Sequence, residues 1–522
     1  MFIKVLLVLA ILGLAVFAFD MYDSVHDVSL VSKDIATTNA KNYLANKGID
    51  INGYDTAIVF TTDNYGYSLL QQKLGEDGFE DFLDEHKLAY YKYSVRFFKE
   101  HEIEEVFVIL DAENGKVIGF NRYIEESESR PPLSQDEAKA KALDFLSLEG
   151  FDKEALEDED YLSDSVFNRT DHFFTFKFKG TDLDTDFGST HLSLSITVLG
   201  DGIEGYDEPF VFVPETFYRS IDTQFGLGDL LSILAILAST LVLLASLVVM
   251  IIGFVKASIK WKIFLYIAIG VFVLLVLNSI NEYQSIKYYY PTELPFFAFL
   301  LSTLSLSLIG SLGNSITLFI TGASGQFLSN EIWPRKLYSK NASKSILIGY
   351  MVGLFSLGLT SLIFLFGEKY LGVWYLADIS NYNNLLTIIP IIPVLMISIL
   401  PAISEEFTYR LFGITFLKKY LKSTCLAVIL MTIIWAVAHS SSPVFPFYFR
   451  AIEVFIGGLI FAYFFVRYDL ITVITAHFIF NALITIPIFL AYGNFLYTST
   501  ALLVAILPLI LAVIPLFRKR LS

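Results

Sequence analysis

The chain has 522 residues, 54% of them hydrophobic, and its mean hydropathy is +0.58. Several segments exceed the ~18 apolar residues that a membrane-spanning helix needs, which excludes an ordinary soluble protein. The net charge of −16 argues against nucleic acid as a partner, because phosphate binding needs a basic surface. The single cysteine, Cys425, excludes an intrachain disulfide.

The first element is an apolar run at residues 1–19 that carries only Lys4. It is either a signal anchor or a cleaved signal peptide, and the poor cleavage motif around Val16–Ala18 favours the anchor. The acidic residues follow this run: residues 20–226 hold 43 of the 53 Asp and Glu but 18 of the 37 Lys and Arg. This charge distribution predicts an acidic water-facing domain, followed by a mildly basic membrane domain.

The acidic domain contains an internal duplication. VSKDIATTNAKNYLANKGID begins at Val31 and LSQDEAKAKALDFLSLEGFD begins at Leu133, an offset of 102 residues. Each copy starts with a serine suited to cap an amphipathic helix, and each is followed by strand-like segments. Asn114-Gly115 and Asp201-Gly202 are hairpin signals. We expect two α+β repeats, at about 30–128 and 132–215, whose pattern resembles the PepSY-type domain of bacterial envelope proteins.

The remaining chain predicts an all-α polytopic membrane bundle of about nine helices within 229–517. The segments lie near 229–255, 262–280, 296–320, 345–366, 385–416, 424–442, 452–466, 470–488 and 498–517. Basic residues gather in alternate loops, at 256–262, 335–344, 418–422 and 467, and in the tail at 518–522. The positive-inside rule places these in the cytoplasm of a cell with 20–226 outside the plasma membrane.

Few ionisable residues fall inside these apolar segments, and four of them lie at similar depth. Glu405 and Glu406 follow an uncharged run, and His439 and His477 lie in two later segments. Glu406 precedes Lys418 by twelve residues, which is ~18 Å along a straight helix. A charged group in lipid costs ~2.5 kcal/mol or more, so such groups face a partner or a cavity. We therefore expect one shared site.

The spacing around these four residues is that of helix faces. Glu406 and Arg410 are four residues apart, as are Trp435 and His439, and His477 and Asn481. Three helices would thus present a carboxylate, an imidazole, and an imidazole with an amide. Such groups can activate water and stabilise an oxyanion. Glu405, His439 and His477 are also a possible zinc ligand set.

Each of these features also has a purely structural interpretation. A Glu406–Arg410 pair can be a structural ion pair, because charges in membranes are normally paired. His439 can cap a helix or lie at the membrane interface, and Asn481 can join two helices. A non-catalytic binding or immunity protein that keeps the polar cluster for structure is therefore the alternative to an enzyme.

Three ordered motifs resemble those of the CPBP intramembrane proteases, which include the CAAX-prenyl endopeptidases and Abi immunity proteins. EEFTYR, WAVAH and HFIFN fit the family's EExxxR, aromatic-xxx-H and HxxxN patterns, and the resemblance covers about 385–490. Pro443 departs from the polar residue that many relatives carry there. A prenylated substrate therefore does not follow.

The resemblance implies an intramembrane endopeptidase, or metalloendopeptidase, that hydrolyses membrane-associated protein substrates. Glu405 would activate water with Glu406 beside it, and Arg410 would order the helix. His439 and His477 would position water or hold a metal, and Asn481 would stabilise the oxyanion. Zinc and a metal-free glutamate mechanism both remain open.

Overall fold

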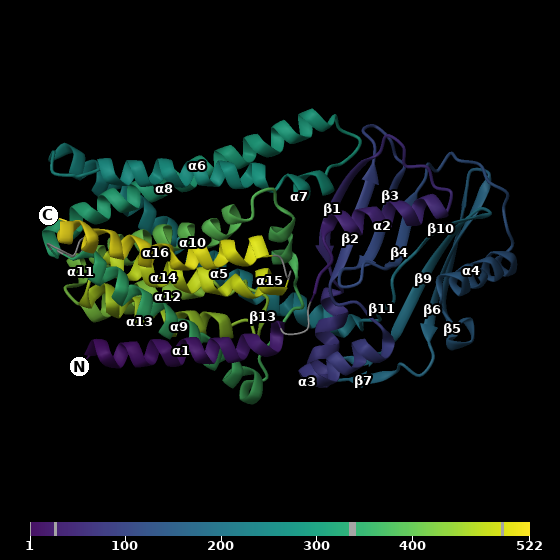
Figure 1. Ribbon diagram of the computed structural model, residues 1–522, viewed down its shortest axis with the longest axis horizontal. Helices are drawn as coiled ribbons and strands as arrows, with labels where there is room; N and C mark the ends of the chain where they lie inside the picture. Colours follow the sequence, from purple (N-terminus) through teal and green to yellow (C-terminus); the bar gives the residue numbers. More distant parts are fainter. Residues whose placement is uncertain (1, 26–28, 334–340, 492–494, 522) are drawn as a thin grey trace.

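The computed structural model describes the whole chain except residues 1, 26–28, 334–340, 492–494 and 522. Figure 1 shows a sheet-rich N-terminal domain at one end of a bundle of long helices. Within the described residues, eight helices are long and apolar enough to cross a membrane. The expectation of a polytopic helical bundle joined to an N-terminal α+β domain is confirmed at this level. Arg335, Lys336 and Lys340 of one basic cluster lie outside the described residues.

The N-terminal domain is built from helices and mostly antiparallel strands that alternate along the chain. Its elements are α2 (Lys33–Asn46), β1 (Asp55–Thr61), α3 (Asn64–His86), β2 (Lys92–Phe98), β3 (Glu105–Asp111), β4 (Val117–Tyr123), α4 (Gln135–Glu149), η1 (Lys153–Ala155), β5 (Leu156–Val166), β6 (Arg169–Phe178), β7 (Leu183–Thr185), β8 (Gly188–Thr190), β9 (Leu192–Leu199), β10 (Gly202–Tyr206) and β11 (Phe210–Val211).

The bundle comprises α1 and everything after the sheet. Its elements are α1 (Phe2–Val25), α5 (Glu215–Val255), α6 (Lys262–Asn281), α7 (Tyr283–Tyr288), α8 (Phe296–Ile332), α9 (Ala342–Leu371), β12 (Trp374–Tyr375), η2 (Ser380–Leu386), α10 (Ile391–Glu405), the π-helix η3 (Glu406–Ile414), α11 (Thr415–Leu421), α12 (Thr424–Val437), β13 (Val444–Phe445), α13 (Phe449–Arg467), α14 (Leu470–Ile484), α15 (Ile486–Ala491) and α16 (Phe495–Leu521).

Nine strands form one continuous sheet in the order β1-β2-β3-β4-β10-β9-β6-β5, with β11 paired to β9. Every pairing is antiparallel, and β4 meets β10 through Tyr206 opposite Phe120. The two halves of the domain therefore share one sheet.

The helices α2 and α4 pack on this sheet with equivalent residues. Ser32 and Ser134 cap their first turns, as the sequence predicts. The buried positions are Ala36, Ala40 and Leu44 in α2, and Ala138, Ala142 and Leu146 in α4, each pair separated by 102 residues. All six belong to one apolar core with the inner face of the sheet. Burial of these small residues lets both helices lie close to the strands.

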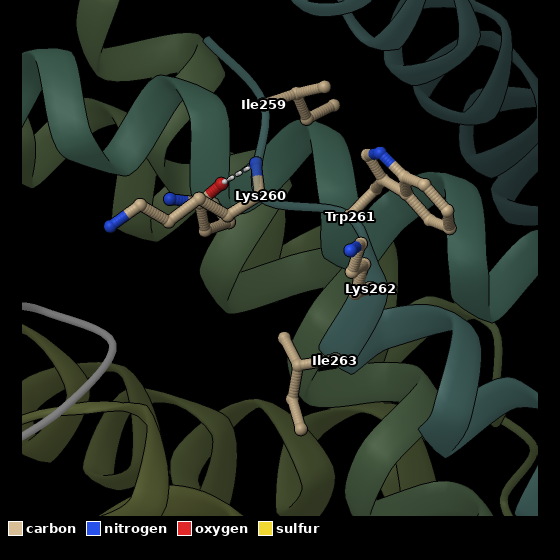
Figure 2. Close-up of a pocket in the computed structure, with 6 residues that line it drawn as sticks. Ile259, Lys260, Trp261, Lys262 and Ile263 are labelled. Atoms are coloured by element: carbon tan, nitrogen blue, oxygen red, sulfur yellow. Dashed lines mark hydrogen bonds between the residues drawn. The ribbon is translucent and has the colours of Figure 1, made fainter.

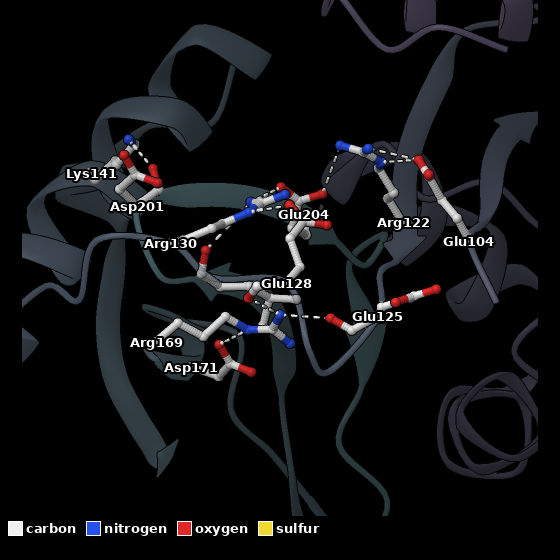
Figure 3. A network of polar contacts seen from close by, with 11 residues as sticks. Glu104, Arg122, Glu125, Glu128, Arg130, Lys141, Arg169, Asp171, Asp201 and Glu204 are labelled. Carbon is white, nitrogen blue, oxygen red and sulfur yellow. Dashed lines mark hydrogen bonds and ion pairs between the residues drawn. The ribbon is translucent and has the colours of Figure 1, made fainter. Parts of the chain in front are cut away.

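Charged side chains bridge the place where the two halves of the sheet meet (Figure 3). Glu204 of β10 is 6% exposed and pairs with both Arg122 of β4 and Arg130 of the segment before α4. The other side of the Arg122 guanidinium meets Glu104 at 2.6 Å. Because Arg122 belongs to β4 and Glu204 to β10, their ion pair holds the two strands together in addition to the backbone hydrogen bonds.

The membrane bundle covers the edge strand β1 of this sheet. The Phe60 backbone N–H donates to Asn383 Oδ1 at 2.8 Å, and Lys287 of α7 pairs with Asp55 at 2.7 Å. An uncovered sheet edge would invite pairing with another chain, so these contacts protect it. They also fix the N-terminal domain to the loops after α6 and α9.

Helix α1 packs along α9 as part of the bundle. A Cβ atom on Gly358 would lie 2.3 Å from the Gly13 Cα atom, so the two backbones touch at this crossing. Leu6 and Ala10, on the preceding turns of α1, are buried. Small residues permit such close approach between membrane helices. Helix α1 is therefore packed closely against the bundle at this crossing.

Candidate active site

The segment that carries both glutamates is not the straight α-helix that its sequence suggests. The expected helix over 385–416 divides into η2, α10, the π-helix Glu406–Ile414 and the start of α11. Pro401 lies inside α10 and has no N–H to donate to the Ile397 carbonyl one turn earlier. Single turns of π-helix are frequent at functional sites. Glu405 is the last residue of α10, and Glu406 is the first of the π-helix.

Asn481 of α14 satisfies the carbonyl that Pro401 leaves unpaired. Its Nδ2 atom donates to the Ile397 oxygen at 3.2 Å. An unsatisfied carbonyl inside a membrane bundle is costly, so this bond compensates for the proline. The observed contact of Asn481 therefore corresponds to the structural interpretation, in which the amide joins two helices.

Glu406 forms the closed half of the polar cluster. Its side chain is completely buried, and its Oε1 atom lies 3.1 Å from an Arg410 nitrogen and 2.9 Å from His477 Nδ1. The Arg410 guanidinium lies 4.0 Å from the Trp435 ring centroid, so the cation also contacts an aromatic face. The expected pairing of Glu406 with Arg410 is present, and His477 completes it from α14.

Glu405 forms the open half of the cluster. Its side chain is 25% exposed, its Oε2 atom accepts the Trp435 Nε1–H at 2.5 Å, and the same oxygen lies 3.9 Å from His477 Nε2. His477 therefore lies between the two carboxylates, with Nδ1 on Glu406 and Nε2 facing Glu405. When Nδ1 donates to Glu406, Nε2 of the neutral ring is left as an acceptor.

His439 reaches the cluster from the turn that follows α12. Its Nδ1 atom lies 2.8 Å from the Trp435 carbonyl, and its ring meets the Trp435 ring edge-to-face at 5.3 Å. A bond to the carbonyl places the proton on Nδ1 and leaves Nε2 free. Trp435 also packs against the His477 ring at 6.1 Å. One tryptophan thus positions Glu405, Arg410 and both histidines.

The donors do not form a ready metal site in this arrangement. Within the described part of the chain, no three His, Cys, Asp or Glu side chains gather in a way that could hold a metal ion. Glu405, His439 and His477 are the ligand set that a bound zinc ion would use, and that possibility stays a prediction. In both histidines Nδ1 makes a hydrogen bond, which leaves the two Nε2 atoms as the nitrogens that could bind a metal. These two atoms and the Glu405 carboxylate do not gather as a three-ligand group.

Contacts from α5, a helix that carries none of the three motifs, support the cluster. The Ser232 hydroxyl lies 3.3 Å from the Ala438 carbonyl, next to His439. The Ser239 hydroxyl meets the Tyr409 hydroxyl at 3.0 Å, one turn after Glu405. Three serines, at 232, 239 and 246, recur every seven residues in α5. This spacing indicates a polar helix face that contacts other helices.

A cavity of about 430 Å³ lies away from these residues, where the α5–α6 connection meets α8 (Figure 2). It is lined by Ile259, Lys260, Trp261, Lys262, Ile263 and Gln326. The Gln326 side chain accepts the Lys260 backbone N–H at 3.1 Å, which fixes the connection to α8. None of the glutamates or histidines of the polar cluster lines this cavity, so it is separate from that cluster.

Comparison with known proteins identifies the segment that contains the cluster. Residues 387–483 match the family model described as type II CAAX prenyl endopeptidase Rce1-like. The domain at residues 387–483 is similar to this family. All seven residues singled out by the three motifs lie in this domain: Glu405, Glu406, Arg410, Trp435, His439, His477 and Asn481. The resemblance to CPBP intramembrane proteases is thereby confirmed.

A curated relative also matches part of the chain. The sporulation-killing factor biosynthesis protein SkfC of Bacillus subtilis (strain 168) is 29% identical over 197 residues. The match covers 36% of this chain and 39% of the relative, so it spans about two fifths of the relative's length. No solved structure matches the chain significantly. The similarity to known proteins therefore rests on residues 387–483 and on the partial match to this relative.

Proposed function

We propose that the chain is an intramembrane endopeptidase that hydrolyses peptide bonds of membrane-associated proteins. One observation carries the proposal: Glu405 is a partly exposed carboxylate, held by Trp435 and facing an imidazole, next to the fully buried Glu406. Two adjacent glutamates in such different surroundings suit different roles. A structural ion pair accounts for Glu406 and Arg410 but gives no reason for an open carboxylate beside them.

In the proposed reaction, Glu405 takes a proton from water, and the resulting hydroxide bonds to the carbon of the peptide carbonyl. The carbonyl electrons move to its oxygen, where His439 Nε2, when protonated, donates a hydrogen bond. Glu405 then returns the proton to the leaving nitrogen as the carbon–nitrogen bond breaks. The products are a carboxyl and an amine. His477, Glu406 and Arg410 fix the charge around Glu405, and Asn481 holds the bend at Pro401.

The proposed mechanism uses no metal ion, because the donor set does not form a three-ligand group. Chelation by 1,10-phenanthroline is therefore expected to leave cleavage in isolated membranes unchanged. Loss of cleavage that added zinc restores would replace this mechanism with a metal-dependent one. In that case the free histidine nitrogens would be the first candidate ligands.

The test of the function is a comparison of protein termini in cells that carry the wild type or Glu405→Gln at equal membrane levels. A set of new termini present only with the wild type is expected, and it names the substrates. Glu453→Gln is the matched control: Glu453 is a buried membrane carboxylate that pairs with Arg450 and Thr360, outside the cluster. Identical termini in all three cell lines would instead favour the non-catalytic binding or immunity protein.

We propose that residues 20–226 lie outside the cell. We also propose that they form two PepSY-like repeats that bind substrate or gate its access. Both chain ends lie at the opposite end of the bundle (Figure 1), which would face the cytoplasm. Cys425 is exposed there, at the start of α12. An impermeant maleimide is expected to label it only after the membrane is opened. Labelling of Cys425 in intact cells would show that the orientation is the opposite of the one proposed.

A further inference from the structure

The helix α5 links the N-terminal domain directly to the candidate active site. It runs without interruption for 41 residues from Glu215 to Val255. Its first turns bury Phe217 and Ile221 in a cluster with Leu69 of α3 and with Phe445, which follows His439 by six residues. The same helix therefore packs on the sheet-rich domain and on the loop that follows His439.

The next turns of α5 contact this loop through Gln224, Gly228 and Ser232. Gln224 Oε1 accepts the Phe447 N–H at 3.1 Å. At Gly228 the helix approaches so closely that a Cβ atom would lie 2.4 Å from the Ser440 carbonyl oxygen. Phe217, Ile221, Gln224, Gly228 and Ser232 are separated by three or four residues, so they occupy one face of α5.

Ser232 holds the turn in which His439 lies. Its hydroxyl lies 3.5 Å from the Val437 carbonyl and 3.3 Å from the Ala438 carbonyl, and its oxygen accepts the Ser441 N–H at 3.1 Å. The last carbonyls of a helix have no partner within the helix, and α12 ends at Val437. The Val437 carbonyl accepts the Ser440 N–H, and Ser232 adds a hydroxyl from another helix to the Val437 and Ala438 carbonyls. It thereby fixes the backbone on both sides of His439.

We propose that Ser232, on the helix that joins the N-terminal domain to the candidate active site, is a positioning residue for His439. The expected effects of Ser232 on rate rest on the proposed endopeptidase function. The imidazole of His439 is held by one bond, to the Trp435 carbonyl, so its direction follows the backbone of the turn. Without the Ser232 bonds the turn shifts, and Nε2 no longer points to the reacting carbonyl.

The kinetic test uses the full chain in lipid nanodiscs and a peptide that spans a cleavage site found by terminal mapping. Ser232→Ala is expected to lower kcat about tenfold with KM nearly unchanged, as loss of hydrogen bonds that act on a catalytic group predicts. Ser232→Thr keeps the hydroxyl and should restore most of the rate. Ser246→Ala is the matched control, because Ser246 is a buried serine of the same helix that bonds Ser324 instead.

A second measurement does not depend on catalysis. Diethyl pyrocarbonate modifies histidine nitrogens, and mass spectrometry gives the rate at His439. We expect this rate to change in Ser232→Ala and to match the wild type in Ser246→Ala.

These measurements separate the two proposals. If no peptide is cleaved but the labelling of His439 depends on Ser232, the positioning role stands and the protease function fails. If the wild type cleaves, and Ser232→Ala cleaves equally fast with unchanged labelling of His439, the positioning role is overturned.

Discussion

Glu406→Gln is expected to destabilise the protein by about 3–5 kcal/mol, because it leaves the Arg410 cation buried without its counter-charge. The Arg410 side chain is 2% exposed and the Glu406 side chain 0%, so water cannot replace the lost partner. Glutamine keeps the shape and an oxygen that can accept from His477 Nδ1. The loss of stability in Glu406→Gln therefore measures the contribution of the Glu406 charge. Unfolding of the purified protein by a denaturing detergent gives the change in free energy.

Two further variants decide the origin of this loss. Glu406→Gln combined with Arg410→Met removes both charges and is expected to recover much of the stability, since an apolar replacement of a buried ion pair is often tolerated. Glu405→Gln should unfold like the wild type, because Glu405 is partly exposed and is not paired with a cation at hydrogen-bond distance. A Glu406→Gln protein as stable as the wild type would show that the buried pair contributes no net stability.

Glu405→Gln is expected to lower kcat for peptide cleavage ~10²–10⁴-fold, the range that a positioned general base contributes. The amide oxygen can still accept the Trp435 Nε1–H, so the side chain should keep its position. KM and stability are therefore expected to stay near the wild-type values. Steady-state rates in nanodiscs, with the peptide found by terminal mapping, measure this effect.

Glu453→Gln serves again as the control for removal of a buried membrane carboxylate. Its carboxylate belongs to α13 and bonds Thr360 of α9, so cleavage should continue at a similar rate per folded molecule. A Glu405→Gln enzyme that retains more than about a tenth of the wild-type rate would remove Glu405 from the role of general base. Glu406 would then be the remaining carboxylate of the pair to test.

The pattern of the sequence was sufficient to predict the pairing at the centre of the site. Glu406 and Arg410 can be paired from spacing alone, because residues four apart share a helix face. The motifs also placed His439 and His477 with the glutamates, since charged and polar groups in a membrane must find partners. Ser32 and Ser134 were predictable as caps because their effect is local.

Other features depend on contacts between distant segments and were not predictable in the same way. The π-helix after Glu405 is one example, because apolar periodicity suggests an ordinary helix there. The bond from Asn481 to the Ile397 carbonyl is another, and the oxyanion role implied by the resemblance stays a prediction. The proline four residues after Ile397 was the overlooked signal. In the N-terminal domain, α3 lies between β1 and β2, so the first half is more than the simple helix-then-sheet unit expected.

The buried pair on the π-helix also bears on how the protein is made. Among the eight candidate spans of the described chain, the segment Ile391–Leu421 has the lowest hydropathy, 1.6. Each charged residue near the centre of a span opposes insertion by about 2.5–3.5 kcal/mol. Glu406 meets His477 only after 71 more residues have been synthesised. Until α14 leaves the ribosome, this segment lacks that partner, and its stable integration into the bilayer is therefore a late step of biogenesis.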